Sequence, residues 1–574
     1  MTLKKKLIIA VAAVVLFAAL VALVSYLLTD GWWNNGGDEI YTDLDGASIY
    51  VFAKDNPTLP FDVKVFISEG VATVFTPGGT DLSRICYTLF DEDGEETGKF
   101  TVDLSSGKTC KGTCGGEEIV MQARQATLPT VSVTTIGENT IEDVFADKYK
   151  KTVSYGDMEI YVPDELCQSK GWDSVYKTEN ATDSDPGSVR FKGRGHSSWM
   201  YLDKKSLSVK SEEGFSPLGL DKNRDFVLIS NHYDRSLIRN AIMYDLYAKL
   251  TDDYSVEYRD VHLFVNGEYY GMYLLTQKVE VANDRVDITD LEEKNEDLNG
   301  KSDYGNSIID VLESGATVKY WPKLESPKDV TGGYLIEIDL ESRGKSEKSY
   351  VKTSYGTFYV IKSPEYISYD EAMYISGYLQ DMEDAIHSPT GKNSKGKHYS
   401  EYVDIESLAM IYVLDEISMN IDGGRTSSYF YKDSDSVDGM LYRGPIWDYD
   451  LALGNYKKYA KPENMEVITY YCFEQLMMHD DFRNEVKKQY NKISPMFHSL
   501  INEGIQDKVD SLITDTEMNF TRWNDIFGIT LGVVSHPEAG RSYHGAVDYL
   551  EEFLETRIKW LDRNFFDEID KLDK

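Results

Sequence analysis

The most informative part of the chain ends in Ile446–Gly454, which reads Ile-Trp-Asp-Tyr-Asp-Leu-Ala-Leu-Gly. In an extended backbone, the side chains of Asp448 and Asp450 would lie on the same face, about 6.5–7 Å apart. Two carboxylates so placed can share a hard cation such as Mg²⁺, whose ligands in proteins are oxygens. The alternative interpretation is a charged turn at the end of a strand, without a ligand.

Upstream of this stretch, apolar residues at helical spacing predict a helix over 405–419. The predicted helix ends at Asn420–Gly424, which reads Asn-Ile-Asp-Gly-Gly. An acid that follows a helix end and precedes two glycines lies in a loop and can point into a cleft. Asp422 is therefore a candidate functional residue.

A second candidate stretch is Phe191–Trp199, which reads Phe-Lys-Gly-Arg-Gly-His-Ser-Ser-Trp. A Gly-x-Gly turn allows backbone N–H groups to approach an anion, and Gly195 is its second glycine. Arg194, Ser197 and Ser198 add further donors. The alternative is a tight turn with no ligand.

The strand that follows carries lysines on both of its faces. Lys204–Lys210 reads Lys-Lys-Ser-Leu-Ser-Val-Lys, which is typical of a short strand. Lys205 and Lys210 would lie on opposite faces of this strand, so only one of them can reach a bound phosphate. The other would extend its amine into solvent.

Together these stretches resemble the CotH (spore coat protein H) kinase family. The agreement lies in the order and spacing of several blocks across roughly residues 128–500, which is more specific than any single motif. The blocks are Leu128-Pro-Thr-Val-Ser, Arg194-Gly-His-Ser-Ser-Trp with Lys-Lys-Ser-Leu-Ser-Val-Lys210, Val261–Val279, Asn420-x-Asp422 and Trp447-Asp-x-Asp-x-Ala-x-Gly454.

The resemblance implies an atypical protein-kinase-like fold that binds ATP and Mg²⁺ or Mn²⁺ and phosphorylates Ser or Thr of a protein. Asp422 would take the place of the catalytic acid, while Asp450, with Asp448 as the second choice, would bind the metal. The nucleotide would be held by Arg194, Gly195, Ser197 and Lys210.

The chain departs from the family pattern at two positions. The pattern suggests Asn five residues after the catalytic acid, and this chain has Ser427, whose hydroxyl would be the weaker metal ligand. The family often has Glu where this chain has Gln277. Glu280 would then have to pair with the phosphate-binding lysine.

The wider sequence predicts an α+β domain over 128–574, with a strand-rich half followed by a helical half as two lobes. Asn266-Gly267 between two apolar runs predicts a hairpin. A helix is expected over 235–250, a polar surface excursion over 284–327, and helices over 368–386, 405–419, 473–501, 506–520 and 546–566. Short alternating runs predict a small all-β, sandwich-like module over 47–127.

The N-terminus predicts a membrane anchor. Three lysines within residues 1–6 precede an uncharged apolar run over 7–28, long enough to span a bilayer without a clear cleavage site after it. The lysines place residues 1–6 in the cytoplasm, so that the linker 29–46 and all that follows lie outside. The net charge of −37 argues against nucleic acid as a partner and favours cations or basic substrates.

Two functions remain open from the sequence. One is a membrane-tethered kinase that acts on secreted or envelope proteins, which the set of three acids with Lys210 favours. The other is a non-catalytic binding or assembly protein of an envelope or coat structure, which Ser427 and Gln277 favour.

Overall fold

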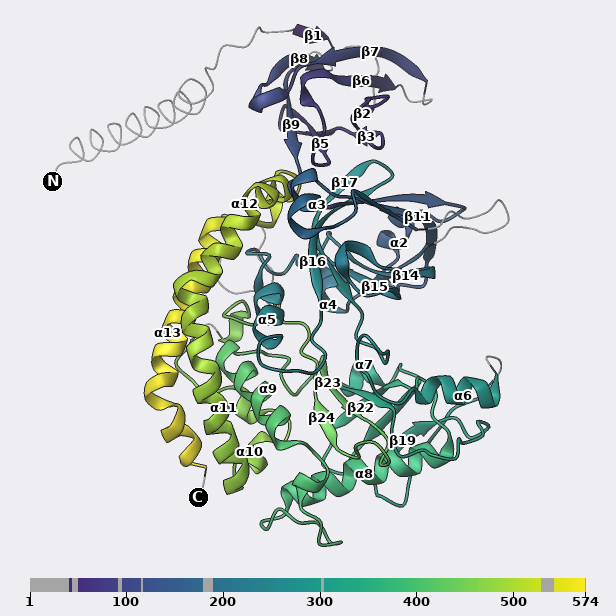
Figure 1. Cartoon of the computed structure of the whole chain (residues 1–574), viewed down its shortest axis with the longest axis vertical. Helices are drawn as coiled ribbons and strands as arrows, with labels where there is room; N and C mark the ends of the chain where they lie inside the picture. The colour runs from purple at the N-terminus through teal and green to yellow at the C-terminus, as the bar shows by residue number, and fades with distance from the viewer. Residues whose placement is uncertain are drawn as a thin grey trace, which may run out of the picture. The chain divides into compact units, whose positions relative to one another are not determined.

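The computed structural model divides into two compact units, the first ending at Gln125 and the second beginning at Ala126 (Figure 1). Within the part of the chain that the structure describes, no helix is long and apolar enough to cross a membrane. The predicted anchor over 7–28 and most of the linker lie outside this part. The structure describes residues 41–43, 50–90, 95–114, 117–178, 189–300, 304–459, 461–527 and 541–572.

The first unit consists of two β-sheets, one in the order β1-β8-β9-β5-β4 and one in the order β3-β2-β6-β7. Its buried side chains are mostly apolar and include Val74, Ile85 and Tyr87. The strands are β1 Tyr41–Asp43, β2 Tyr50–Ala53, β3 Val63–Lys64, β4 Phe66–Ser68, β5 Val71–Thr76, β6 Ile85–Phe90, β7 Glu96–Val102, β8 Cys110–Cys114 and β9 Glu117–Gln125.

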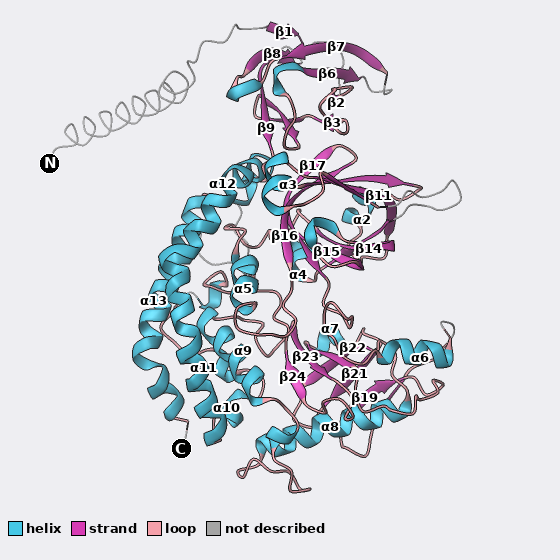
Figure 2. Cartoon of the chain, in the orientation of Figure 1, coloured by secondary structure: helices cyan, strands magenta, loops and turns pink. Residues whose placement is uncertain are grey.

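The second unit begins with a sheet that closes on itself (Figure 2). Its strands follow the order β10-β16-β17-β15-β14-β13-β11, and β10 pairs with both end members, parallel to β16 and antiparallel to β11. A short strand, β12, pairs with β11 outside the ring. The strands are β10 Thr130–Ile136, β11 Val153–Tyr161, β12 Val175–Lys177, β13 Val189–Arg194, β14 Ser206–Phe215, β15 Asn223–Ile229, β16 Tyr258–Val265 and β17 Glu268–Gln277.

One face of this sheet encloses a small apolar core of its own. Alternate residues of the strands contribute to this core, among them Phe191, Leu207 and Leu263. The helix α2 (Ile141–Ala146) adds Ile141 and Val144. Because side chains alternate along a strand, Arg190, Lys192 and Arg194 of β13 lie on the opposite, outer face.

The hairpin predicted at Asn266-Gly267 is present. Both residues have positive φ, 48° and 77°, as a two-residue hairpin turn requires. Val265 and Glu268 pair across the turn.

The helix predicted over 235–250 is shorter than expected, because α5 spans Arg239–Tyr247. Leu237 has a φ of 62°, so the backbone before Arg239 is not helical. The Asp234 side chain instead accepts hydrogen bonds from the backbone N–H groups of Ser236 and Arg239. The predicted helix start at Arg235 was therefore wrong.

A second sheet follows in the order β18-β19-β21-β22-β20-β23-β24. The prediction of a surface excursion over 284–327 was incomplete, because this segment contains the helix α6 (Leu291–Asn299) and the strands β18 and β19. Val318 and Tyr320 are buried. The strands are β18 Ile308–Val311, β19 Thr317–Tyr320, β20 Tyr334–Ile338, β21 Ser349–Lys352, β22 Phe358–Ser363, β23 Ser428–Lys432 and β24 Leu441–Arg443.

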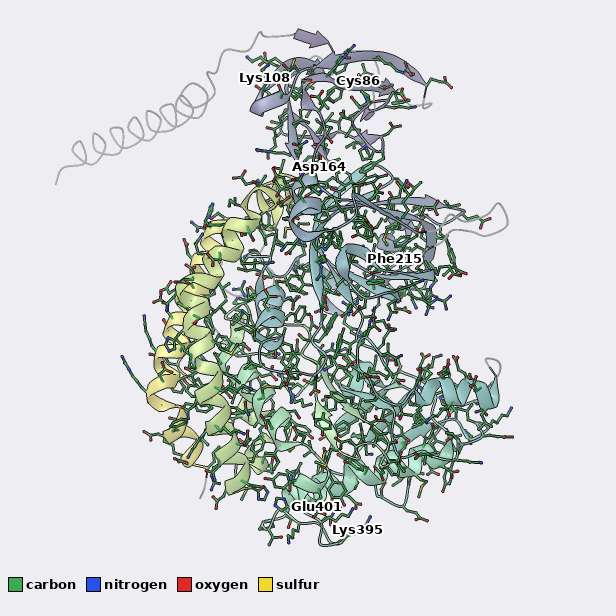
Figure 3. All side chains as sticks on the ribbon, in the orientation of Figure 1. Cys86, Lys108, Asp164, Phe215, Lys395 and Glu401 are labelled. Carbon is green, nitrogen blue, oxygen red and sulfur yellow. The ribbon has the colours of Figure 1, made fainter. Side chains whose placement is uncertain are left out.

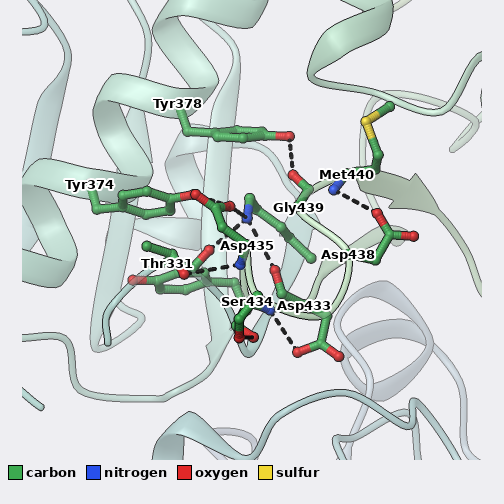
Figure 4. Close-up of polar contacts among 12 residues, drawn as sticks. Thr331, Tyr374, Tyr378, Asp433, Ser434, Asp435, Asp438, Gly439 and Met440 are labelled. Atoms are coloured by element: carbon green, nitrogen blue, oxygen red, sulfur yellow. Dashed lines mark hydrogen bonds and ion pairs between the residues drawn. The ribbon is translucent and has the colours of Figure 1, made fainter. Parts of the chain in front are cut away.

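A buried lysine, Lys432, holds the loop between β23 and β24 in place through hydrogen bonds (Figure 4). The Lys432 ammonium donates to the carbonyl oxygens of Thr331 and Asp433 and to Asp435 Oδ1, at 2.6, 3.0 and 2.8 Å. It also lies over the rings of Tyr374 and Tyr378 of the helix α8 (Tyr369–His387), and burial lowers its pKa. The loop is thereby held against α8.

The C-terminal part of the second unit is helical, as predicted. The helix predicted over 473–501 is interrupted, however, because residues 477–479 separate α10 from α11. The helices are α3 Asp164–Lys170, α4 Ser197–Tyr201, α6 Leu291–Asn299, α7 Glu341–Gly344, α8 Tyr369–His387, α9 Ile405–Ser418, α10 Phe473–Leu476, α11 Asp480–Ser499, α12 Ile505–Arg522 and α13 Tyr543–Asp570. The mixed α+β class, with strand-rich and helical parts, is confirmed.

Candidate active site

The loop that carries Asp422 begins where α9 ends. Met419 takes a left-handed conformation with a φ of 49°, which turns the chain away from the helix axis. The backbone N–H of Asp422 donates to Asn420 Oδ1 at 3.1 Å, and the Asp422 carbonyl accepts from the N–H groups of Arg425 and Thr426 at 2.9 and 3.0 Å. The loop around Asp422 is therefore tightly hydrogen-bonded.

Asp415, near the end of α9, ties this loop to the Trp-Asp-x-Asp stretch. Its carboxylate is buried and accepts hydrogen bonds from Arg443 Nη2 at 2.7 Å, Tyr449 OH at 2.5 Å and Asn420 Nδ2 at 3.0 Å. One carboxylate therefore holds Asn420, two residues before Asp422, Arg443 of β24, and Tyr449, the residue between Asp448 and Asp450.

The backbone at Asp448 is not extended, in contrast to the prediction. Asp448 has a φ of 67° and lies in no strand, because the chain turns here. The Tyr449 N–H donates to Asn240 Oδ1 at 2.7 Å, and Arg239 donates to the carbonyl oxygens of Ala452 and Leu453 at 3.2 and 3.3 Å. Contacts with α5 thus determine the path of this stretch.

The acids from the two loops lie close enough to act on one another. The pKa of Asp422 is raised to about 8, chiefly by burial and next by the charge of Asp448, while Arg343 and Arg425 partly offset the rise. Burial, followed by the charges of Asp448 and Asp422, also holds the pKa of Asp450 well above its usual range. The structure therefore gathers Asp422, Asp448 and Asp450 into one region, where nearby arginines offset their negative charge only in part.

Ser427, the departure from the family pattern, reaches the same region. Its Oγ donates a hydrogen bond to Asp448 Oδ2 at 3.1 Å. The possible metal ligands gathered here are all oxygens, and the charges of the carboxylates repel one another. This arrangement fits a hard divalent cation. Among the described residues, no three His, Cys, Asp or Glu side chains lie close enough to form a coordination shell alone. A bound cation would need oxygens from another molecule as well.

The turn after β13 lies beside the acids. The Arg194 guanidinium lies 5.2 Å from the centre of the ring of Trp447, the residue that precedes Asp448 in the chain. Burial raises the pKa of the Tyr233 hydroxyl. A hydrogen bond with the Ser197 side chain lowers this pKa, and the charge of Asp450 raises it, so Tyr233 lies near both residues. The structure thus places Arg194 and Ser197 near the candidate metal ligands.

The two glycines of the turn serve the packing of the protein itself. A Cβ on Gly193 would lie 2.2 Å from the Trp199 ring, so the missing side chain makes room for this indole. Gly195 has a φ of 91°, and a Cβ there would meet Ser198 Oγ at 2.6 Å. Packing on Trp199 explains Gly193, which lies within β13, and the tight turn explains Gly195.

Lys210 and Glu280 belong to a separate chain of ion pairs. Lys210, with 47% of its side chain exposed, pairs with Asp225 at 3.0 Å and not with Glu280. Asp225 is 4.0 Å from Lys278, which pairs with Glu280 at 3.0 Å. The expected pairing of Lys210 with Glu280 is therefore replaced by the cross-strand pair with Asp225, which faces Lys210 on β15.

Another lysine, Lys192, lies nearer to Arg194 than Lys210 does, as the strand register shows. Lys210 pairs with Arg190, four residues before Arg194 on β13, a separation of about 13 Å along the strand. Lys192 is exposed on the same face and only two residues from Arg194. The alternation Arg190, Lys192, Arg194 was a signal for this residue that the motif-based interpretation missed.

The supporting residues were also missed from the sequence. For Asp415 a signal existed, since an acid that directly follows the apolar run Leu408–Leu414 must find a partner when the helix is buried. For the contacts of Arg239 and Asn240 with the Trp-Asp-x-Asp stretch no local signal exists, because these partners lie more than 200 residues away.

Two comparisons with known proteins bear on this arrangement. No curated protein sequence matches the chain. The profile of the family described as "CotH kinase protein" matches residues 189–561, which contain the turn after β13, the Asp422 loop and the Trp-Asp-x-Asp stretch. The chain therefore belongs to the CotH kinase family.

Proposed function

We propose that the protein is a membrane-tethered, extracytoplasmic protein kinase that transfers the γ-phosphate of ATP to Ser or Thr of secreted or envelope proteins. Membership of the CotH kinase family makes it a kinase-like protein, and such proteins in general use ATP, a divalent metal and a protein substrate. The observation that carries the proposal is the gathering of Asp422, Asp448 and Asp450, from two separate loops, into one site.

Asp422 is proposed to position and deprotonate the acceptor hydroxyl. A general base works best when its pKa lies near the working pH, and the pKa of Asp422 is raised to about 8. Its backbone is held by hydrogen bonds to Asn420, Arg425 and Thr426, so the backbone that carries the carboxylate does not depend on substrate for its position. Such preorganisation is what phosphoryl transfer requires of the protein.

Asp450 and Asp448 are the proposed metal ligands, with Ser427 beside them. When bound, Mg²⁺ or Mn²⁺ would neutralise the charge of the phosphates. Arg194 and Lys192, on the outer face of β13, are suited to donate to phosphate oxygens. Lys210 and Glu280 are proposed to act further from the acids, as part of the ion-pair chain through Asp225.

The location outside the cytoplasm rests on the sequence. Residues 7–28 form the proposed anchor, and three lysines precede it. A net charge of −37 keeps the chain from an anionic membrane surface and favours basic protein substrates.

A second candidate function is a non-catalytic assembly protein that keeps the kinase-like scaffold. Two observations favour it. The hydroxyl of Ser427 is already hydrogen-bonded to Asp448, and Lys210 is paired with Asp225. Lys210 would have to give up Asp225 to bind a phosphate, and the Ser427 hydroxyl offers a cation only its lone pairs, a weaker ligand than a carboxamide oxygen.

The deciding experiment combines binding and transfer. The full chain in detergent is mixed with γ-labelled ATP, Mg²⁺ or Mn²⁺ and a mixture of envelope proteins, and ATP binding is followed in parallel by the shift in melting temperature. Metal-dependent stabilisation together with labelled Ser or Thr supports the kinase. If ATP causes no shift at any metal concentration, the assembly function takes its place.

A further inference from the structure

The turn between α2 and β11, residues 147–152, carries a lysine in an unusual backbone conformation. Figure 1 labels both elements. Lys150 has a φ of 56°, in the left-handed region that residues other than glycine rarely adopt. Such conformations are unfavourable and persist only where the surrounding structure holds them, and they are concentrated at active sites and ligand sites. The contacts of this turn show what holds Lys150 and where its side chain lies.

Asp147, the residue that follows α2, holds the turn together. Its carboxylate accepts hydrogen bonds from the backbone N–H groups of Tyr149, Lys151 and Thr152 at 2.8, 2.6 and 2.7 Å. These hydrogen bonds, that from Thr152 first, lower the pKa of Asp147 to about 2. The N–H of Lys150 donates to the Asp147 carbonyl at 3.1 Å. The backbone at Lys150 is therefore fixed by the turn itself.

Two hydrogen bonds tie this turn to the turn after β13. The Lys150 ammonium donates to the Gly195 carbonyl at 2.5 Å. The Trp199 indole N–H of α4 donates to the Asp147 carbonyl at 3.0 Å. The two turns therefore form one rigid unit, and the ammonium of Lys150 is placed at the residue that follows Arg194.

This contact lies at one end of β13 and β14. Arg194, the last residue of β13, pairs with Ser206, the first residue of β14. Phe215, which Figure 3 labels, is the last residue of β14 and marks the opposite end. Lys192 lies on the same outer face as Arg194, two residues before it. Lys150 thus joins Arg194 and Lys192 at the end of the sheet that lies beside the candidate metal ligands.

Positive charge outweighs negative charge around Lys150. Burial lowers the pKa of Lys150, and the charges of Arg194 and Lys192 lower it further, whereas the charge of Glu347 raises it. The carboxylate of Glu347 also lies 4.0 Å from the ammonium of Lys362, so its charge is shared. Within the described residues, Lys150, Lys192 and Arg194 form no ion pair. Three cations are therefore close together without a carboxylate of their own.

The ammonium of Lys150 keeps donors for a ligand. An ammonium carries three N–H groups, and among the described residues the Gly195 carbonyl is its one hydrogen-bond partner. The carboxylate of Asp147 does not take up the others, because it faces the backbone N–H groups of its own turn. The Lys150 side chain is half-buried, so it is neither fully solvated nor closed off. Free donors beside two other cations are suited to an anion with several acceptor oxygens.

We propose that Lys150 is a further phosphate-binding residue, which holds the polyphosphate of the nucleotide together with Arg194 and Lys192. A triphosphate has enough oxygens to accept hydrogen bonds from all three side chains at once, and charge-assisted hydrogen bonds of this kind are strong. Lys150 lies before residue 189, where the family match begins, so the matched segment does not contain this contact. The inference rests on the proposed nucleotide site and adds to it a residue from another part of the chain.

The test uses one ligand with the adenosine part and one without it. Isothermal titration calorimetry of the full chain in detergent measures the affinities for ATP and for inorganic tripolyphosphate, both with Mg²⁺. Lys150→Gln should weaken both affinities by about tenfold, since it removes one charged contact. The matched control is Lys148→Gln, which removes the same charge from an exposed residue of the same turn. It should change either affinity by no more than about twofold, because salt screens an exposed charge that makes no contact.

A second variant keeps the test valid if Lys150→Gln does not fold. Glycine adopts a φ of 56° without strain, so Lys150→Gly should keep the turn while it removes the ammonium. It should weaken both affinities as Lys150→Gln does, and the same comparison with Lys148→Gln then decides.

The two ligands separate the role of Lys150 from the kinase proposal. If the wild type binds ATP and the Lys150 variants bind it as tightly as Lys148→Gln does, the role of Lys150 is contradicted and the kinase proposal stands. If the wild type binds tripolyphosphate but not ATP, the kinase proposal falls. In that case a loss of tripolyphosphate binding in the Lys150 variants retains a polyphosphate site at Lys150, and an unchanged affinity contradicts it. Binding of neither ligand overturns both.

Discussion

At the scale of single residues, Asp422 and Asp450 carry the same side chain in two different surroundings. Asp422 lies in a loop fixed by Asn420 and Arg425, whereas Asp450 follows the turn at Asp448. Asp450→Asn should weaken metal-dependent ATP binding, because it removes one charge from the metal site. Asp422→Asn should bind ATP nearly normally but transfer phosphate at least about a hundredfold more slowly, as for loss of a general base.

The measurement pairs ATP binding with transfer of labelled phosphate in both variants. Equal defects of the two variants in both assays would contradict the division of roles.

The raised pKa of Asp422 also has a consequence for stability. The carboxyl titrates near 3.9 in an unfolded chain and at about 8 in the folded protein, so the folded state holds an extra proton between these values. The free energy of unfolding of the metal-free protein should therefore fall as the pH rises from 5 to 8. Chemical denaturation with a chelator present measures this, and Asp422→Asn should lack that part of the decrease. A variant whose stability keeps the wild-type slope would show that Asp422 does not hold the proton.

Gly193 offers a test of packing at one atom. Gly193→Ala would place a methyl group 2.2 Å from the Trp199 ring and should lower the free energy of unfolding by about 1–3 kcal/mol, the usual effect of overpacking. Gly377→Ala is the control, since Gly377 lies in α8 with no atom within 4 Å of the new Cβ. There the change should be neutral or stabilising. Equal urea midpoints for both variants would contradict the role of Gly193.

At the scale of elements, Arg239 joins α5 to the stretch after Asp450. It pairs with buried Asp234 and donates to the carbonyl oxygens of Ala452 and Leu453. Arg239→Met leaves these groups without their donor and should lower the free energy of unfolding by about 3–5 kcal/mol.

Urea denaturation provides the measurement, with Arg563→Met on the exposed side of α13 as the control. The control should change stability by no more than about 0.5 kcal/mol. A loss in Arg239→Met that does not exceed the control would show that the buried pair is dispensable.

Elements with local signals were predictable, and those determined by distant contacts were not. The hairpin at Asn266-Gly267 and the capping box that begins α8 at Ser368 are written within a few residues of sequence. The conformation of Asp448 depends on Asn240, which is 209 residues from Tyr449 in the chain. The partner of Lys210 depends on which strand lies next to β14, and the motif alone does not carry this information.

At the scale of the whole molecule, the proposed anchor places residues 1–6 and the rest of the chain on opposite sides of a membrane. Residues 7–28 are expected to remain uncleaved, because the apolar run is long and lacks a small-residue cleavage site. Protease added to intact cells should remove most of the protein and leave a short N-terminal piece. A mature N-terminus near residue 30, or full protection in cells with a permeable outer layer, would contradict the anchor.

The closed sheet has a consequence for any attempt to isolate the kinase-like part. The family match begins at residue 189, but β10 and β11, which close the ring, lie before it. A fragment of residues 189–561 would leave β13 and β16 as bare edges that can recruit strands from other molecules. It would also remove the backbone donors of Thr127 and Leu128 from buried Asp515. Such a fragment should aggregate, so the segment shared by the family is shorter than the segment that folds.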